Sequence, residues 1–328
     1  MPQVSIIVPV YNGEKFIEGL FSCFNKQTFD DFEVVFVNDG STDRTLALLS
    51  EICSKSSGKY CVFSQGNKGV SAARNYAIDN SRGKYITFVD VDDLITPNYL
   101  EMLMKYQNGK EDSISICSVD FGYIKRNESS CICSSEQVLE DYLFGRKHFG
   151  VWGALFPKKI FNENKIRFET GYKYSEDLCV MWKVLCVIDR INIIAQKLYI
   201  YRDIPNSAMS KINDSRLDSI TLMQNLKPYV ADKCPSFYEK YKKFAVPRMA
   251  WSLLWQASHY NTYDVFLTFI KKYDFKSDML QLRKYPDLKV SLSARFFVVS
   301  PKIFYYLAKI VTRNFRKNEK QKESNYNM

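Results

Sequence analysis

Two periodicities of apolar residues alternate along the first hundred residues of the chain. Short runs rich in β-branched and aromatic residues have the continuous apolar pattern of strands that are buried on both faces. Between these runs, apolar residues recur three and four positions apart, as in helices. The predicted strands are Val4–Val10, Glu33–Val37, Tyr60–Phe63 and Tyr85–Val89, and the predicted helices are Glu14–Asn25, the segment after Asp43, and Val70–Asn80. Repeated strand–helix units of this length predict the α/β class, with a doubly wound, mostly parallel sheet.

The pattern changes after residue 100. The later predicted elements are a helix from Pro97 to about Asn108, a strand at Ser113–Val119, a strand at Gly153–Phe156, a helix at Glu176–Val187 and a strand at Ile191–Tyr201. From Arg216 onward the periodicity is mainly helical. We therefore expect an α/β domain over residues 1–210, with halves at 1–100 and 101–210, followed by a helical C-terminal region over residues 211–328.

Composition supports a large folded chain with an uneven distribution of charge. Of the 328 residues, 46% are hydrophobic and 15% aromatic, which excludes bulk disorder and allows a sizeable core. The net charge is +10, yet residues 1–239 hold 28 basic and 30 acidic side chains, against 18 and 6 in residues 240–328. The partner of the basic C-terminal region must therefore be sought apart from the function of the near-neutral part.

Cysteine and histidine usage narrows the possible chemistry. The nine cysteines are an odd number, scattered and often inside apolar runs, so we expect reduced core cysteines of a cytosolic protein. Cys131 and Cys133 form a Cys-x-Cys without a second half, which disfavours a zinc site. Only two histidines are present, which disfavours His-rich metal sites. We expect neither a signal peptide nor a spanning helix, and the sequence has no Walker loop and no Gly-x-Gly-x-x-Gly.

An acidic cluster directly follows the fourth predicted strand. Asp90, Asp92 and Asp93 place three carboxylates within four residues, where they repel one another unless a cation is present. Carboxylates completed by water and phosphate suit Mg²⁺ or Mn²⁺, which would neutralise a diphosphate leaving group. The alternative is an acidic turn that caps the next helix. The position directly after an apolar strand favours the metal, because parallel sheets bind ligands at that edge.

Three further segments have both a functional and a structural interpretation. Asp39, after the second strand, can accept a hydrogen bond from a base or ribose, or can be an Asx-turn residue beside Gly40. Lys68 and Arg74 can meet phosphate or ribose, or can flank an ordinary helix start. The pair Glu176-Asp177 heads a helix, where a carboxylate can be a general base or simply a favourable helix-start residue.

Taken together, five segments resemble glycosyltransferases of family 2, which have the GT-A fold. In chain order they are Val4–Asn12, Gln27–Phe29, Val37–Asp43, Gly69–Asn75 and Phe88–Asp93. Each is weak alone, but five in order at the expected spacing are specific. The resemblance extends over roughly residues 3–205, and from Ser210 onward no motif can be carried over. It implies a GT-A catalytic domain over 1–210, with a nucleotide-binding half and an acceptor-binding half.

The resemblance implies the following donor-side roles. The nucleotide would be bound by Pro9, Val10, Tyr11, Asp39, Lys68, Arg74 and Asp90, with Asp39 on a base that is commonly uracil. Asp92 would be the main protein ligand of Mn²⁺ or Mg²⁺, and Asp93 would lie toward the donor sugar. A loop with Tyr201-Arg202, Ser207 and Ser210 would close over the diphosphate.

On the acceptor side, the resemblance implies that Asp177 deprotonates the acceptor hydroxyl. Glu176 and Trp152 would contact donor or acceptor, with Trp152 offering a flat apolar face to a sugar; core packing is the alternative for this ring. The implied activity is transfer, with inversion, from a nucleotide-sugar, commonly a UDP-sugar, to a glycan or lipid-linked acceptor in cell-surface polysaccharide synthesis. The chain lacks a Gln-x-x-Arg-Trp sequence, which favours single additions over processive synthesis.

Two other functions are compatible with parts of the sequence. Asp90-Val91-Asp92 also resembles the nucleophile motif of haloacid-dehalogenase-like phosphatases, although that motif favours Thr or Val where Leu94 stands. A catalytically degenerate transferase acting as a membrane scaffold is the non-enzyme alternative. The intact Asp92 and Asp177 favour an enzyme.

The C-terminal region has a composition suited to a membrane surface. Residues 296–311 are apolar and aromatic but interrupted by Pro301 and two lysines, and the basic residues Arg313, Arg316, Lys317, Lys320 and Lys322 follow. This pattern favours an interfacial helix on an anionic inner leaflet, and hence a cytoplasmic, peripheral location. A packing helix followed by a solvated charge run is the alternative. Nucleic acid is disfavoured, because the aromatic residues do not lie among the basic ones.

Overall fold

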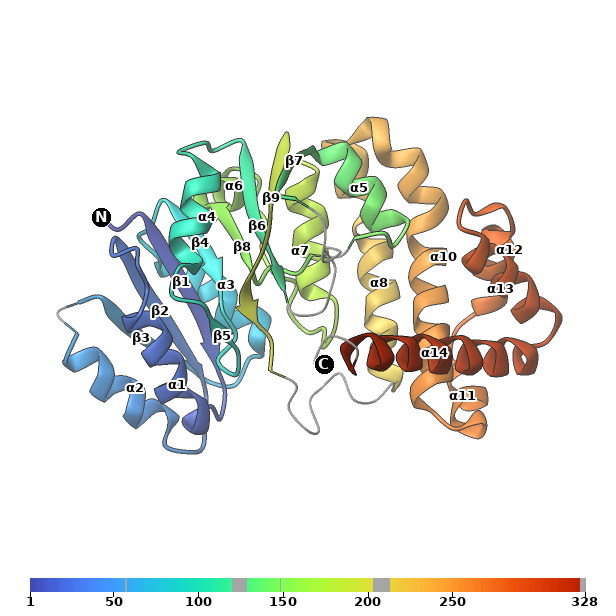
Figure 1. Ribbon diagram of the computed structural model, residues 1–328, viewed down its shortest axis with the longest axis horizontal. Coiled ribbons are helices and arrows are strands. Elements are labelled where there is room, and N and C mark those ends of the chain that lie inside the picture. The colour runs from blue at the N-terminus through green and yellow to red at the C-terminus, as the bar shows by residue number, and fades with distance from the viewer. Residues whose placement is uncertain (57, 120–128, 148, 203–212, 325–328) are drawn as a thin grey trace. The chain divides into compact units, whose positions relative to one another are not determined.

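The computed structural model describes residues 1–56, 58–119, 129–147, 149–202 and 213–324, with the backbone alone at 119 and 313–324. The chain divides into two units, Met1–Asp203 and Ile204–Met328 (Figure 1). The division falls seven residues before the boundary expected at 210. Both positions lie in 203–212, outside the described residues.

The first unit contains a mixed sheet of nine strands, ordered β3-β2-β1-β4-β8-β6-β9-β5, with β7 paired to β9. The strands are β1 (Val4–Val10), β2 (Phe32–Asp39), β3 (Tyr60–Gln65), β4 (Tyr85–Phe88), β5 (Leu94–Ile95), β6 (Ser113–Val119), β7 (Cys131–Ser134), β8 (Ala154–Pro157) and β9 (Arg190–Ile200). β3, β2, β1 and β4 are parallel to one another, and β8 runs antiparallel between β4 and β6. The predicted α/β class is thereby confirmed.

Helices cover both faces of this sheet, because successive residues of each strand point to opposite sides. The helices are α1 (Glu14–Asn25), α2 (Thr45–Ser54), α3 (Val70–Asn80), α4 (Tyr99–Gln107), α5 (Ser135–Leu143), α6 (Lys158–Glu163) and α7 (Glu176–Leu185). On one face, Ile6 and Val8 of β1 share a core with Leu20 of α1 and Leu103 of α4. Figure 1 shows α1 and α2 side by side along this face. On the other, the Phe88 ring lies 5.2 Å from that of Phe168.

The second unit is helical, as expected. Its helices are η2 (Asp214–Leu217), α8 (Asp218–Asn225), α9 (Lys227–Lys233), α10 (Pro235–Tyr260), α11 (Tyr263–Ile270), α12 (Phe275–Gln281), η3 (Leu282–Lys284), α13 (Leu288–Val299) and α14 (Pro301–Ser324). The indole of Trp251 stacks on that of Trp255 at 5.1 Å and donates a hydrogen bond to Ser293 Oγ at 2.8 Å. Among the described residues, no helix combines the length and apolarity required to cross a membrane.

Candidate active site

Three strands deliver polar residues to one edge of the sheet. Val10 pairs with Asn38 and Ile7 pairs with Phe88, all in parallel register, so the carboxyl ends of β1, β2 and β4 lie next to each other. Tyr11 follows β1, Asp39 ends β2, and Asp90 comes two residues after β4. The ligand-binding edge expected of such a sheet is therefore lined by residues that the sequence singles out.

The loops after β1 and β2 are tied together by hydrogen bonds. The Asn12 amide donates to Ser41 Oγ at 2.9 Å, and its side-chain Oδ1 accepts from the Thr42 amide at 2.8 Å. Asn12 has a φ of 49°, a left-handed conformation that Asn tolerates better than most residues. Pro9 and Val10 are buried within β1, whereas Tyr11 is 50% exposed and has ring surface available to a ligand. The contact of these three residues with a nucleobase stays a prediction.

Asp39 organises the loop between β3 and α3. Its Oδ1 accepts hydrogen bonds from the Lys68 amide and from Gln65 Nε2, and its Oδ2 accepts one from the Gly69 amide, all at 2.8 Å. The turn amide of Ser41 instead donates to Asn38, at 3.2 Å. The buried Asp39 thus shapes this side of the edge, while the Lys68 side chain is exposed. Their contacts with base, ribose or phosphate stay predictions.

The loop that carries Asp90, Asp92 and Asp93, here termed the acidic loop, is fixed by residues at the end of β9 and just after it. Asp93 is 1% exposed; its Oδ2 accepts from the Tyr199 hydroxyl at 2.8 Å and its Oδ1 from the Arg202 amide at 3.0 Å. Burial raises the pKa of Asp93 to about 7. The Tyr199 oxygen also accepts a hydrogen bond from the Asp90 amide at 3.1 Å, and Arg202 Nε donates to the main-chain oxygen of Asp92. The Asp93 carboxylate is therefore occupied within the protein, and its approach to a donor sugar stays a prediction.

Arg74 joins the acidic loop to the head of α7. Its Nη2 lies 2.8 Å from Asp90 Oδ1 and its Nη1 lies 3.1 Å from Glu176 Oε1, and the side chain is 4% exposed. The guanidinium also lies over the Phe168 ring, 5.2 Å from its centroid. The two carboxylates keep the pKa of Arg74 above its usual value despite burial. This residue was expected to contact ribose or diphosphate; the structure shows it engaged by residues 16 and 102 positions away.

Asp177 stands at the start of α7, beside this bridge. Its Oδ1 accepts a hydrogen bond from the Leu178 amide at 2.7 Å. Burial raises the pKa of Asp177, against the opposing charge of Arg74. Burial and the nearby Asp177 charge likewise raise the pKa of Glu176. A carboxylate with a raised pKa is a stronger proton acceptor at neutral pH than an ordinary one, as a general base requires.

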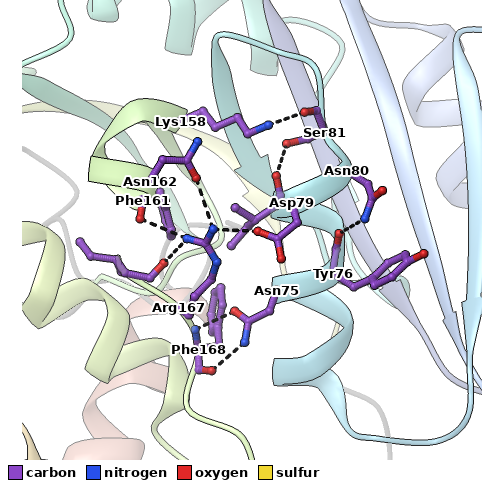
Figure 2. A network of polar contacts seen from close by, with 12 residues as sticks. Asn75, Tyr76, Asp79, Asn80, Ser81, Lys158, Phe161, Asn162, Arg167 and Phe168 are labelled. Carbon is purple, nitrogen blue, oxygen red and sulfur yellow. Dashed lines mark hydrogen bonds and ion pairs between the residues drawn. The ribbon is translucent and has the colours of Figure 1, made fainter. Parts of the chain in front are cut away.

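The segment that leads into α7 is fastened to α3 (Figure 2). The Asn75 side chain donates to the Phe168 carbonyl and accepts from its amide, both at 2.8 Å. Arg167 forms an ion pair with Asp79 at 2.7 Å. Arg74 and Asn75 are consecutive residues of α3, so one helix positions both the acidic loop and the approach to α7. Periodicity and local motifs alone contain no sign of this Asn75–Phe168 contact.

Trp152 lies between the two halves of the first unit. It pairs with Phe88 in an isolated parallel bridge, and its ring lies 6.2 Å from that of Tyr199. A Cβ atom on Gly150 would come within 2.4 Å of the indole, so this position accepts only glycine while the ring is there. Trp152 is half-buried and packs against the core, and its contact with a sugar stays a prediction.

The acidic loop has a donor set suited to a hard divalent cation. Burial raises the pKa of Asp92, and the charge of Asp90 adds to that rise. Mg²⁺ and Mn²⁺ use one or two carboxylates together with substrate phosphate, so a larger protein cage is not required. Within the described ranges, no group of three or more His, Cys, Asp or Glu is arranged to hold a metal.

Two residues of this site were missed by the sequence patterns. They are Tyr199 and Phe168, which no local pattern distinguishes from other core aromatics. Arg202 was expected in a loop with Ser207 and Ser210; the latter two lie outside the described residues. Away from the site, the Sγ atoms of Cys131 and Cys133 lie 3.7 Å apart on β7.

Known glycosyltransferases are similar to this chain in sequence. The family model described as Glycosyl transferase family 2 matches residues 5–148. "Uncharacterized glycosyltransferase EpsJ" of Bacillus subtilis is 30% identical over 221 residues, 63% of each protein. "Glycosyltransferase GlyA" of Streptococcus pneumoniae is 29% identical over 68% of this chain and 35% of its own length. The chain thus spans about a third to under two thirds of these curated relatives.

Solved structures share the fold. A crystal structure of S. aureus TarS in complex with UDP-GlcNAc is 19% identical, with a TM-score of 0.68 over 96% of this chain and 92% of that one. The mannosyltransferase PcManGT from Pyrobaculum calidifontis, in complex with GDP-Man and Mn²⁺, is 17% identical, with a TM-score of 0.50 over 96% of this chain and 88% of that one. The expected resemblance is confirmed: residues 5–148 match the model of glycosyltransferase family 2, and the chain has the GT-A fold.

Proposed function

We propose that the chain transfers a sugar, with inversion, from a UDP-sugar to a hydroxyl of a glycan or lipid-linked acceptor in cell-surface polysaccharide synthesis. The family match supports nucleotide-sugar chemistry, and the structurally similar TarS binds UDP-GlcNAc. The observation that carries the proposal is the Arg74 bridge. It joins Asp90 of the acidic loop to Glu176 of α7 at the ligand-binding edge, where a donor and an acceptor would have to meet.

On the donor side, Tyr11 and Asp39 lie at adjacent strand ends and would frame the base. The half-exposed Tyr11 ring offers a stacking surface. Asp39 uses three of its hydrogen-bonding positions internally, and a carboxylate has about four, so one remains for a base N–H. Lys68, exposed on the same loop, would meet phosphate or ribose.

Asp92, with Asp90 beside it, would hold Mn²⁺ or Mg²⁺. When bound there, the cation would neutralise charge on the diphosphate. The Asp90 side chain is 28% exposed and is fixed on one side by Arg74. That fixing keeps the donor set in place before the nucleotide arrives, which lowers the cost of binding.

On the acceptor side, Asp177 would take the proton from the attacking hydroxyl. The hydroxyl oxygen forms the new bond to the anomeric carbon while the bond to the nucleotide diphosphate breaks on the opposite face. The proton ends on Asp177 and the electron pair leaves with the diphosphate, so a single displacement inverts the anomeric centre. The ion pair with Arg74 would neutralise Glu176, so that no second unpaired negative charge lies next to Asp177.

Thermal unfolding with UDP, GDP or CDP, each with and without Mn²⁺, tests the donor side. A ligand at about a hundred times its dissociation constant stabilises the folded state by roughly 2.7 kcal/mol. We expect a shift with UDP plus Mn²⁺ that is lost in Asp92→Asn. The matched control is Asp31→Asn, an exposed carboxylate just before the amino end of β2, and it should retain the full shift.

The outcomes separate the alternatives. A thermal shift with GDP or CDP in place of UDP would support sugar transfer but change the nucleotide of the proposed donor. Hydrolysis of a phosphate ester without any nucleotide shift would favour the phosphatase. If no nucleotide shifts the unfolding temperature and no turnover is detected, the degenerate scaffold is the remaining alternative. Where a donor is found, NMR of the product's anomeric proton decides between inversion and retention.

A further inference from the structure

The helices α13 and α14 each carry a regular series of exposed apolar residues. On α13, Leu288, Leu292, Phe296 and Val299 recur at three- and four-residue intervals, which places them within about a quarter of the helix circumference. On α14, Ile303, Tyr306 and Ile310 do the same. These seven residues, here termed the apolar stripe, are between 42% and 78% exposed.

The other sides of the same helices already pack within the second unit. Ala294 and Phe297 of α13 and Phe304 and Ala308 of α14 are buried, and the rings of Phe297 and Phe304 lie 5.5 Å apart. Both helices are therefore fixed to the unit by one face and present the apolar stripe on another. Large side chains exposed in such a regular series mark an interaction surface more often than isolated ones do.

The charges along these helices define the partner. Residues 288–312 contain four cations, Lys289, Arg295, Lys302 and Lys309, and no Asp or Glu. Arg295 and Lys302 are exposed. The surrounding region, residues 240–328, holds 18 basic and 6 acidic side chains. The exposed Asp287, the N-cap residue of α13, directly precedes the apolar stripe. An apolar stripe in a region with such an excess of cations is complementary to a surface that is apolar inside and anionic outside.

We propose that the apolar stripe docks the second unit on a bilayer containing anionic lipid. The apolar side chains would enter the boundary between headgroups and acyl chains, while Lys302 and Lys309 would extend their charged ends to lipid phosphates. A second copy of the chain fits less well, because two such faces would bring two sets of cations together with few carboxylates between them. This inference does not depend on the sugar-transfer proposal.

The test is co-sedimentation of the full chain with vesicles of phosphatidylcholine, alone or with about a third phosphatidylglycerol. We expect binding to the anionic vesicles that weakens in high salt. Replacing Leu292, Phe296 and Ile303 together by serine should weaken it about a hundredfold, at roughly 1 kcal/mol for each half-buried side chain. Lys302→Gln with Lys309→Gln should weaken it about thirtyfold, at about 1 kcal/mol for each cation.

The matched control replaces two other exposed apolar residues of the same unit, Val265 and Leu280, by serine. This variant should bind vesicles as the unmodified chain does. Unchanged unfolding midpoints in all variants show that the second unit is still folded, and an unchanged nucleotide shift separates this test from that of the donor site.

Three results would overturn the proposal. The first is equal binding, or no binding, to neutral and anionic vesicles. The second is a triple-serine variant that binds as well as the control variant. The third is a dimer in light scattering that the triple-serine variant dissociates, which would make a second copy the occupant of the apolar stripe.

Discussion

Replacement of Arg74 by methionine tests whether the ion-paired bridge organises the active site. The variant keeps much of the aliphatic volume and leaves Asp90 and Glu176 without their cation. Removing one partner of a buried ion pair costs about 3–5 kcal/mol. Glu176 is 12% exposed and Asp90 is 28% exposed, so water partly compensates Asp90. We therefore expect a loss near the lower end, about 3 kcal/mol in the free energy of unfolding.

The loss should depend on pH in a defined direction. Burial and the Asp177 charge already raise the pKa of Glu176 above its ordinary 4.5, and Arg74 opposes that rise. Without Arg74, the folded-state pKa moves further up, so the folded state holds a proton that the unfolded state releases. Stability is then greatest below the unfolded pKa and falls as pH rises through the folded pKa. The deficit of Arg74→Met should be larger at about pH 8 than at about pH 5.

Chemical denaturation followed by circular dichroism measures this deficit at both pH values. Adding Glu176→Gln to Arg74→Met removes one stranded charge and should recover part of the lost stability. The control is Lys55→Met, which breaks the exposed Lys55–Glu51 pair and should leave the midpoint unchanged. Equal midpoints for Arg74→Met and the unmodified chain, or a deficit that grows toward low pH, would refute the reasoning.

Three further predictions concern neighbouring groups. Asp177→Asn should lower the turnover number by about 10²–10⁴ while leaving the nucleotide-induced thermal shift intact, as steady-state kinetics and thermal unfolding can show. Tyr199→Phe removes a hydrogen bond to the buried Asp93 and should cost about 1–3 kcal/mol in denaturant. Because that bond lowers the pKa of Asp93, which burial raises to about 7, the deficit should grow as pH rises through that value. Asn75→Ala breaks both bonds to Phe168 and should raise KM for the acceptor more than the dissociation constant for UDP.

Several elements were predictable to the residue because a single pattern specifies them. The bounds of β1, β6, α1 and α3 agree with their predictions, since polar residues or glycine delimit the apolar positions of each segment. The helix expected to begin at Pro97 begins instead at Tyr99, with Asn98 as its N-cap residue.

Short elements were missed for a physical reason. β5 has two residues, and β7 has four, of which three are exposed. Neither segment has enough residues for a periodicity to emerge, and both are stabilised by pairing with β9. Their conformation comes from a distant strand, which local sequence does not report.

In the candidate site, too, some features were predictable from the sequence and others were not. The carboxylates Asp39, Asp90 and Asp92 were predictable because they follow buried strands, and parallel strands bring such positions to one edge. The residues that contact those carboxylates were not predictable from the sequence. Tyr199 is 109 positions from Asp90, and contact between them depends on the register of β9. Arg74 was singled out, but its pairing with Glu176 required the fold.

One helix, α3, positions both the acidic loop and the segment that leads into α7. Adjacent residues of a helix point about 100° apart, so Arg74 and Asn75 contact different segments. Arg74 fixes Asp90 and Glu176, and Asn75 fixes Phe168, so the acidic loop and the approach to α7 share one rigid support. A site held this way keeps its geometry without a bound ligand, which is the condition for efficient catalysis. Substitutions of Arg74 should therefore disturb donor and acceptor functions together, whereas substitutions of Asn75 or in the 169–175 segment should act mainly on the acceptor and leave nucleotide binding intact.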